Sequence, residues 1–123
     1  MRAAAVDLLT GLATYGVLRE RLQSEIERSK RSDEPFALLF LDLDSFKQVN
    51  DQFGHEAGNL ILEAVASEIR SVVRASDVAA RYGGDEFAIL LKSTQKLDAL
   101  KLCEKLRQAL EKAGIGKEAE PAA

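Results

Sequence analysis

Among its 123 residues the chain has only one cysteine, Cys103, and one histidine, His55. A single cysteine excludes an intramolecular disulfide framework and most zinc sites. Basic residues do not outnumber acidic ones (17 against 20, net charge −3), so the charge favours neither a nucleic-acid partner nor a membrane surface. No apolar run reaches the length of a transmembrane helix. We therefore expect a cytoplasmic domain that binds no nucleic acid and does not insert directly into a membrane.

The residues that are present predict one domain with a real core, because 46% of them are hydrophobic and 30% are charged. Hydrophobic periodicity predicts helices over 14–31, 46–53, 57–73 and 94–113. Nearly continuous apolar runs predict strands over 36–43, 78–82 and 87–91, the first of them central and buried on both faces. This order predicts an α/β (α+β) sandwich with a ferredoxin-like sheet and helices packed over it.

Two glycines, Gly83 and Gly84, separate the last two predicted strands, and the acidic pair Asp85 and Glu86 follows them. The segment predicts a tight hairpin turn. Glycines tolerate positive φ and let a large ligand approach the backbone closely. Such a cluster, taken alone, is more often a β-turn with solvated charges.

Asp42 and Asp44 end the predicted strand over 36–43 and lie two residues apart, on one face. Two carboxylates at this spacing repel each other unless a cation or a proton intervenes. Asp44 is equally consistent with the N-cap of the short helix that follows. The residues alone leave both interpretations open.

Three segments in this order and spacing resemble the motifs of the GGDEF family of diguanylate cyclases: 7–12, 42–58 and 81–87. The resemblance implies a nucleotidyl-cyclase-like fold. It also implies condensation of two GTP molecules into cyclic di-GMP, with release of pyrophosphate, in bacterial signalling. Each 3′-hydroxyl attacks the α-phosphate of the other nucleotide, so two domains must face each other as a homodimer.

The same resemblance implies a site of defined composition. The metal, Mg²⁺ or Mn²⁺, would be held by Asp42, Asp85 and the carbonyl of Leu43, with Asp44 a further candidate. Asp85 and Glu86 would be the catalytic residues, Glu86 acting on the ribose 3′-hydroxyl. The residues implied in substrate binding are Phe46, Lys47, Asn50, Asn59, Gly83 and Gly84. The amides of Phe46 and Lys47 open a helix, which suits a phosphate, whereas His55 is interpreted as structural.

Arg74 and Asp77 form an Arg-x-x-Asp motif that is separated from Gly83 by five residues. It resembles the inhibitory product site of the family, where cyclic di-GMP binds. An arginine can fork onto a phosphate or a guanine edge, and an aspartate can accept from guanine N–H groups. The alternative is a surface ion pair at a helix end.

The sequence departs from the family pattern at two places. Asn59 stands where the family has aspartate, and the final strand and helix of the family are absent. We therefore expect a domain over 1–116, a disordered tail over 117–123 and one unpaired edge of the strand 36–43. These departures keep an alternative open, a non-catalytic module that binds cyclic di-GMP or GTP as a regulatory sensor.

Overall fold

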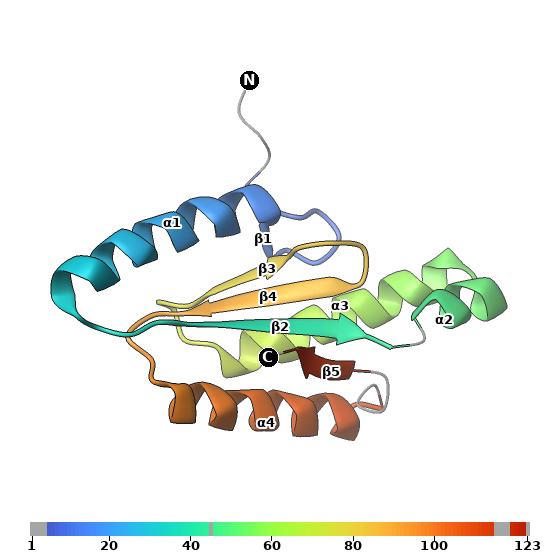
Figure 1. Cartoon of the computed structure of the whole chain (residues 1–123). Coiled ribbons are helices and arrows are strands. Elements are labelled where there is room, and N and C mark those ends of the chain that lie inside the picture. The colour runs from blue at the N-terminus through green and yellow to red at the C-terminus, as the bar shows by residue number, and fades with distance from the viewer. Residues whose placement is uncertain (1–4, 45, 115–118, 123) are drawn as a thin grey trace.

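The computed structural model describes residues 5–44, 46–114 and 119–122. Five strands form one mixed sheet in the order β1-β3-β4-β2-β5. Helix α1 covers one face of this sheet, and helices α3 and α4 cover the other (Figure 1). The elements in chain order are β1 (Ala13–Thr14), α1 (Tyr15–Ser32), β2 (Ala37–Leu43), α2 (Phe46–Phe53), α3 (His55–Val72), β3 (Val78–Arg81), β4 (Glu86–Leu91), α4 (Lys96–Lys112) and β5 (Ala119–Ala122). The predicted α+β sandwich is confirmed.

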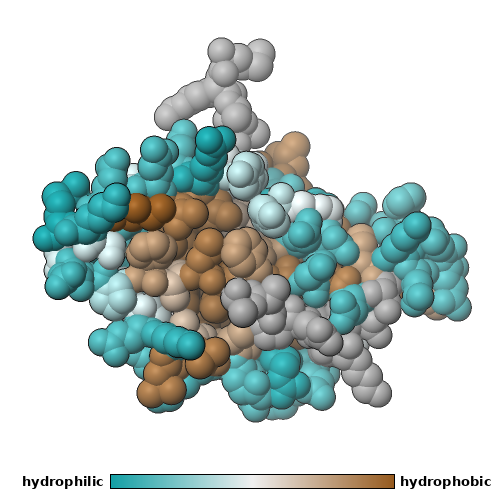
Figure 2. Space-filling model, in the orientation of Figure 1, coloured by the Kyte–Doolittle hydropathy of each residue, from teal (hydrophilic) through white to brown (hydrophobic). Residues whose placement is uncertain are grey.

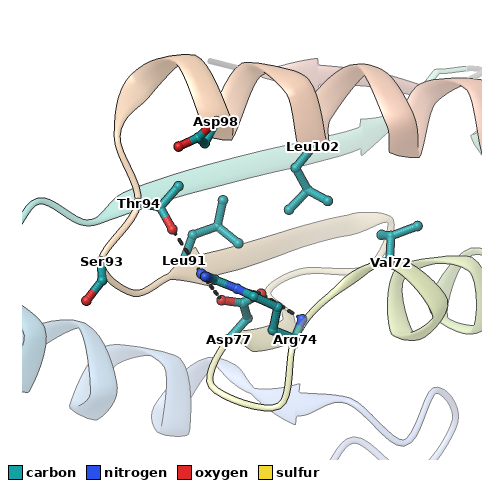
Figure 3. A pocket seen from close by; sticks show the side chains of 8 residues that line it. All are labelled: Val72, Arg74, Asp77, Leu91, Ser93, Thr94, Asp98 and Leu102. Carbon is teal, nitrogen blue, oxygen red and sulfur yellow. Dashed lines mark hydrogen bonds and ion pairs between the residues drawn. The ribbon is translucent and has the colours of Figure 1, made fainter.

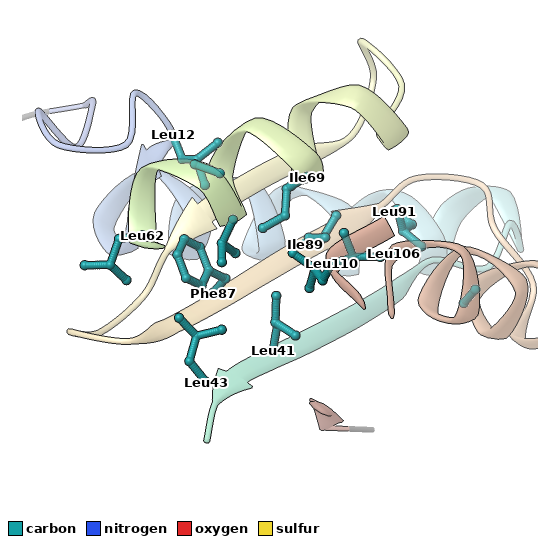
Figure 4. Close-up of a cluster of buried hydrophobic side chains, with 13 residues drawn as sticks. Leu12, Leu41, Leu43, Leu62, Ile69, Phe87, Ile89, Leu91, Leu106 and Leu110 are labelled. Carbon is teal, nitrogen blue, oxygen red and sulfur yellow. The ribbon is translucent and has the colours of Figure 1, made fainter. Parts of the chain in front are cut away.

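The main core lies between the sheet and the helix pair α3 and α4 (Figure 4). Alternate residues of β2 and β4 supply its sheet side, among them Leu41, Leu43 and Phe87. The apolar stripes of the two helices supply the other side, because residues three and four apart share a helix face. The labelled members are Leu12, Leu41, Leu43, Leu62, Ile69, Phe87, Ile89, Leu91, Leu106 and Leu110.

The second face of the sheet has a smaller core, built by Leu18 of α1 on Ala80, Ala88 and Leu90. Because α1 packs over β1, β3 and β4, the adjoining part of β2 is only half-buried. Figure 2 shows hydrophobic side chains gathered on this side of the molecule, around β2. The strand buried along nearly its whole length is β4, so the expectation of complete burial was wrong for 36–43.

The end of the chain differs from the expectation. Residues 119–122 form β5, which pairs antiparallel with residues 40–43 of β2. The predicted disordered tail is therefore wrong for these four residues, and so is the predicted open edge over 40–43. The backbone groups of an edge strand are unpaired hydrogen-bonding groups that another segment can satisfy, and β5 satisfies them here. The predicted boundary at 116 and residues 117, 118 and 123 lie outside the described residues.

In the part of the chain that the structure describes, no helix has both the length and the apolar character needed to cross a membrane.

Candidate active site

The signature turn joins β3 to β4 and is held by backbone hydrogen bonds. The N–H groups of Tyr82 and Gly83 donate to the carbonyl of Glu86 over 2.9 and 3.3 Å. The guanidinium of Arg81 donates to the carbonyls of Gly83 and Gly84, with its shortest bond at 2.8 Å. One side chain of β3 thus fixes the backbone of the turn that follows it.

The two glycines of the turn do not have positive φ, so the conformational reason expected for them was wrong. Gly83 instead lies close to a side chain of the turn itself. A Cβ atom there would collide with the Glu86 carboxylate, whose Cδ would lie only 3.3 Å away. A Cβ at Gly84 would meet nothing within 4 Å. The backbone at Gly84 is therefore open to a ligand, whereas Gly83 makes room for a carboxylate of the chain itself.

The end of β2 lies beside this turn. Asp42 pairs in register with Glu86, and directly opposed residues of antiparallel strands share a face. The N–H of Leu43 donates to the carbonyl of Asp85 over 3.2 Å. Two adjacent strand ends thus bring together all four residues that were expected to act on metal and ribose.

The donor set at this place consists of oxygen atoms. Asp42 is exposed, whereas Asp85 and Glu86 are half-buried. Within the described ranges, no three His, Cys, Asp or Glu side chains are grouped so that they could hold a metal by themselves. Two carboxylates with the carbonyl of Leu43 would still match the oxygen ligands that Mg²⁺ prefers, because Mg²⁺ usually takes one or two carboxylates and completes its shell with phosphates and water.

Helix α2 begins just beyond β2, at Phe46. Lys47 is exposed in its first turn, as a phosphate ligand would need to be. Asp44 lies in the turn between β2 and α2 and is also exposed. The residue directly before α2 is Ser45, which lies outside the described residues, so the N-cap interpretation of Asp44 stays a prediction. His55 begins α3 and is exposed.

The Asn50 side chain is closely packed at the junction of α2 and α3. Its Oδ1 atom is buried without a hydrogen-bond partner in the described structure. A Cβ atom at Gly58 would collide with this amide, lying 2.9 Å from the Asn50 Cγ and 3.2 Å from the Phe46 ring. Asn59 follows Gly58 and is exposed. The sequence pattern contained Gly58 but did not indicate that it seats the Asn50 side chain.

The segment before β1 joins the signature turn through a carboxylate. The backbone N–H and the hydroxyl of Thr10 donate to Asp7 Oδ2 over 2.9 and 2.7 Å, and Arg81 reaches Asp7 Oδ1 at 3.5 Å. Burial would raise the pKa of Asp7, but the hydrogen bonds from Thr10 and the charge of Arg81 outweigh it and lower the pKa. No local sequence pattern indicates this contact, because it joins residues 74 positions apart.

Arg74 and Asp77 meet at the opposite end of β3 (Figure 3). Asp77 accepts from the Arg74 backbone N–H over 2.8 Å and from its guanidinium over 2.9 Å, which raises the pKa of Arg74. The Asp77 side chain is 1% exposed and that of Arg74 is 56% exposed. Arg74 also donates to the Lys92 carbonyl and the Thr94 hydroxyl, each over 2.9 Å.

This pair borders a cavity of about 250 Å³. Its lining residues are Val72, Arg74, Asp77, Leu91, Ser93, Thr94, Asp98 and Leu102. The two residues expected at the product site are thus together beside a cavity, and the ion pair that was the alternative interpretation is also formed. The pair is compatible with both interpretations.

Comparison with protein families gives a match to the model described as "Diguanylate cyclase, GGDEF domain" over residues 4–122. The chain is 47% identical over 106 residues to the bifunctional diguanylate cyclase/cyclic di-GMP phosphodiesterase MucR of Pseudomonas aeruginosa. It is 37% identical over 107 residues to the response regulator PleD of Caulobacter vibrioides. These matches cover 86% and 87% of the chain but only 16% and 24% of the relatives.

Solved structures agree with this comparison. The diguanylate cyclase SiaD of Pseudomonas aeruginosa, in complex with its activator SiaC, matches with a TM-score of 0.83 and 42% identity over 88% of this chain and 42% of that chain. The GGDEF domain of DgcB from Caulobacter crescentus, in complex with c-di-GMP, matches with a TM-score of 0.83 and 32% identity over 90% of this chain and 64% of that chain.

Proposed function

The chain belongs to the GGDEF domain family, and from this premise we propose that it is a diguanylate cyclase domain that condenses two GTP molecules into cyclic di-GMP. The observation that carries the proposal is the meeting of two strand ends, where Asp42 opposes Glu86 and Leu43 bonds to Asp85. A substrate of this kind also favours the cytoplasmic location expected from the sequence.

In this reaction the 3′-hydroxyl oxygen of one GTP forms a bond to the α-phosphorus of the other. The bond from that phosphorus to the β-phosphate oxygen breaks, and pyrophosphate leaves with the electron pair. Glu86 is the proposed acceptor of the hydroxyl proton, because a positioned carboxylate can act as a general base. Each domain holds one GTP, so two copies must face each other for both bonds to form.

Asp42, Asp85 and the carbonyl of Leu43 would hold Mg²⁺ or Mn²⁺. A divalent ion neutralises the charge that develops during phosphoryl transfer. The chain contributes the remaining contacts. The first amides of α2, with the charge of Lys47, would bind phosphate oxygens, since N–H groups are unpaired at a helix N-terminus. Gly83 and Gly84 would let the nucleotide approach the turn, and the open space at Gly84 supports this role.

The Arg74–Asp77 pair is the proposed inhibitory site for cyclic di-GMP. Its support is the cavity beside the pair and the exposure of the Arg74 guanidinium, whose remaining N–H groups can bond to a phosphate or a guanine edge. The crystallised DgcB domain, which resembles this chain, is a complex with c-di-GMP.

The test is incubation of the chain with GTP and Mg²⁺ or Mn²⁺, followed by chromatographic detection of cyclic di-GMP. Asp85→Ala should lower turnover at least about a hundredfold, because the lost ion contact is worth several kcal/mol. Asp51→Ala removes an exposed carboxylate of α2 and serves as the matched control, with turnover unchanged within about twofold. Equal turnover by folded Asp85→Ala and the parent chain would refute the site, and absence of product from the parent chain at both metals would refute the activity.

A further inference from the structure

Three aromatic side chains, Tyr15, Phe40 and Tyr82, meet beside the signature turn, and the proposed function gives them no role. The centroid of the Tyr82 ring lies 5.7 Å from that of Tyr15 and 5.7 Å from that of Phe40. The ring planes are inclined by 53° and 62°, and inclined rings at this separation attract each other, since the positive edge of one approaches the negative face of the other. These three rings are called the aromatic cluster below.

The register of the sheet brings Tyr15 beside Tyr82. Thr14 pairs with Arg81 in the parallel ladder of β1 and β3, at the end of both strands. The next residues along the chain are Tyr15, which begins α1, and Tyr82, which begins the signature turn. Both residues remain partly exposed, Tyr15 by 50% and Tyr82 by 41%, so removal of the Tyr15 ring opens no cavity in the core.

Phe40 places the aromatic cluster next to carboxylates of the candidate active site. Alternate residues of a strand share a face, so Phe40 lies on the same face of β2 as Asp42. Asp42 in turn pairs with Glu86 of β4. The aromatic cluster therefore borders these two carboxylates on the face of the sheet that α1 covers.

Tyr82 is connected to Glu86 through the backbone of the turn. The N–H of Tyr82 donates to the carbonyl of Glu86 over 2.9 Å. The Glu86 carboxylate also rests on Gly83, the residue after Tyr82, where an added Cβ would lie 3.3 Å from its Cδ. Arg81 bonds to the carbonyls of Gly83 and Gly84, which lie beyond Tyr82 in the turn. A displaced Tyr82 ring would therefore move the backbone on which the Glu86 carboxylate rests.

We propose that Tyr15 is a positioning residue for the condensation reaction: its ring holds Tyr82 and, through Tyr82, sets the position of the Glu86 carboxylate. The inference rests on the proposed function, in which Glu86 accepts the proton of the 3′-hydroxyl. It goes beyond that function in assigning a role in turnover to a residue of α1, outside the three segments that resemble family motifs.

This role predicts a loss of turnover without a loss of substrate affinity. The groups proposed to bind GTP belong to the metal site and to the start of α2, whereas the aromatic cluster supports the proposed general base. A positioned general base contributes about 10²–10⁴-fold to a rate, so a base that is displaced but still present should lose about tenfold. An interaction that acts only on the chemical step lowers kcat and leaves KM unchanged.

The experiment measures kcat and KM for cyclic di-GMP formation, with the melting temperature of each variant as a check of folding. Tyr15→Ala should lower kcat about tenfold and leave KM within about twofold of the parent chain. Tyr15→Phe keeps the ring and should restore kcat to within about twofold. Leu97→Ala removes a side chain that is 64% exposed from the first turn of α4, and as the matched control it should leave kcat and KM unchanged.

Two further measurements test the route through Tyr82. In the Tyr82→Ala background, Tyr15→Ala should lower kcat by less than about twofold more, because residues that act through one contact are not additive. The backbone amide NMR signals of Gly83 and Glu86 should shift in Tyr15→Ala and stay in place in Tyr15→Phe and Leu97→Ala. This second readout reports on the turn itself and needs no turnover.

The outcomes separate the two proposals. The inference would be overturned, and the proposed function left standing, by a parent-like kcat in folded Tyr15→Ala or by unmoved amide signals of the turn. The same holds if Tyr15→Phe loses as much turnover as Tyr15→Ala, or if Tyr15→Ala keeps its full effect beside Tyr82→Ala. Absence of cyclic di-GMP from the parent chain with either Mg²⁺ or Mn²⁺ would overturn the proposed function and the inference together.

Discussion

Gly58→Ala should change the stability of the protein in opposite directions, depending on whether Asn50 is present. Gly58 is buried in the first turn of α3. An added Cβ would lie 2.9 Å from the Asn50 Cγ and 3.2 Å from the Phe46 ring, with the amide oxygen closer still. Real Cβ atoms essentially never approach heavy atoms within 3.0 Å, so the Asn50 amide must move.

The magnitude follows from two opposed contributions. Alanine is favoured over glycine within a helix by about 0.5–1 kcal/mol. Forcing an extra methyl group into packed surroundings costs about 1–3 kcal/mol. In the parent chain the collision dominates, and Gly58→Ala should lower the free energy of unfolding by about 1 kcal/mol. In the Asn50→Ala background the amide is gone, and the same substitution should raise stability by up to about 1 kcal/mol once the Phe46 ring, 3.2 Å from the added Cβ, shifts by a few tenths of an ångström.

Urea unfolding of the parent chain, both single variants and the double variant measures this as a double-mutant cycle. We expect a coupling free energy of about 2 kcal/mol between positions 50 and 58, as is typical of residues in direct contact. The GTP affinity of Gly58→Ala should also fall, since Asn50, whose amide is displaced, is among the residues that the family resemblance implies in substrate binding. Additivity within about 0.5 kcal/mol would show that Gly58 does not seat the Asn50 side chain.

Three further predictions concern other parts of the chain. Arg74→Ala should weaken cyclic di-GMP binding at least about tenfold in calorimetry and leave GTP binding intact. An equal loss of affinity for cyclic di-GMP and GTP would show that Arg74 and Asp77 form only a structural ion pair. Because folding lowers the pKa of Asp7, its carboxylate stabilises the protein at pH values above the ordinary pKa of 3.8, and this stabilisation is lost as the pH falls through the folded-state pKa. The urea midpoints of the parent chain and Asp7→Asn should therefore converge in acid and separate towards neutrality. A gap independent of pH would contradict this. Ending the chain after Gly114 should expose the β2 edge over 40–43, cause self-association in size-exclusion chromatography and lower the melting temperature, whereas an unchanged profile and melt would show that β5 is dispensable.

The elements that the sequence predicted well are those whose own side chains determine them. The strand over 36–43 and the hairpin strands over 78–82 and 87–91 are apolar runs bounded by polar breaks, and they form within one residue of the expected positions. The helices begin and end within a few residues of the periodic pattern, because their apolar stripes cover the sheet. Because the strands could be predicted, the sequence also indicated that the end of β2, with Asp42, lies beside the turn that contains Asp85.

The features that escaped prediction depend on partners distant in the sequence. The segment Ala119–Ala122 contains a proline and little that favours a strand, yet it pairs with β2 because an edge strand offers unpaired backbone groups. The role of Gly83 depends on the path of the Glu86 side chain, and that of Gly58 on the Asn50 amide. No local pattern contains these contacts.

The short strand β3 explains why the two candidate sites can be tested separately. Asp77 precedes it and the signature turn follows it, so about four residues, or roughly 13 Å of extended chain, separate them. Strand β3 is hydrogen-bonded on both sides, to β1 and β4, which holds this spacing fixed. The Arg74 guanidinium bonds to Asp77, Lys92 and Thr94, and among the described residues it makes no hydrogen bond or ion pair with the turn. Its removal therefore leaves the backbone of Gly83 and Gly84, which Arg81 holds, unchanged. A loss of GTP affinity in Arg74→Ala would then have to pass through β3 itself, and a shift in the amide signals of Val78–Arg81 would detect it.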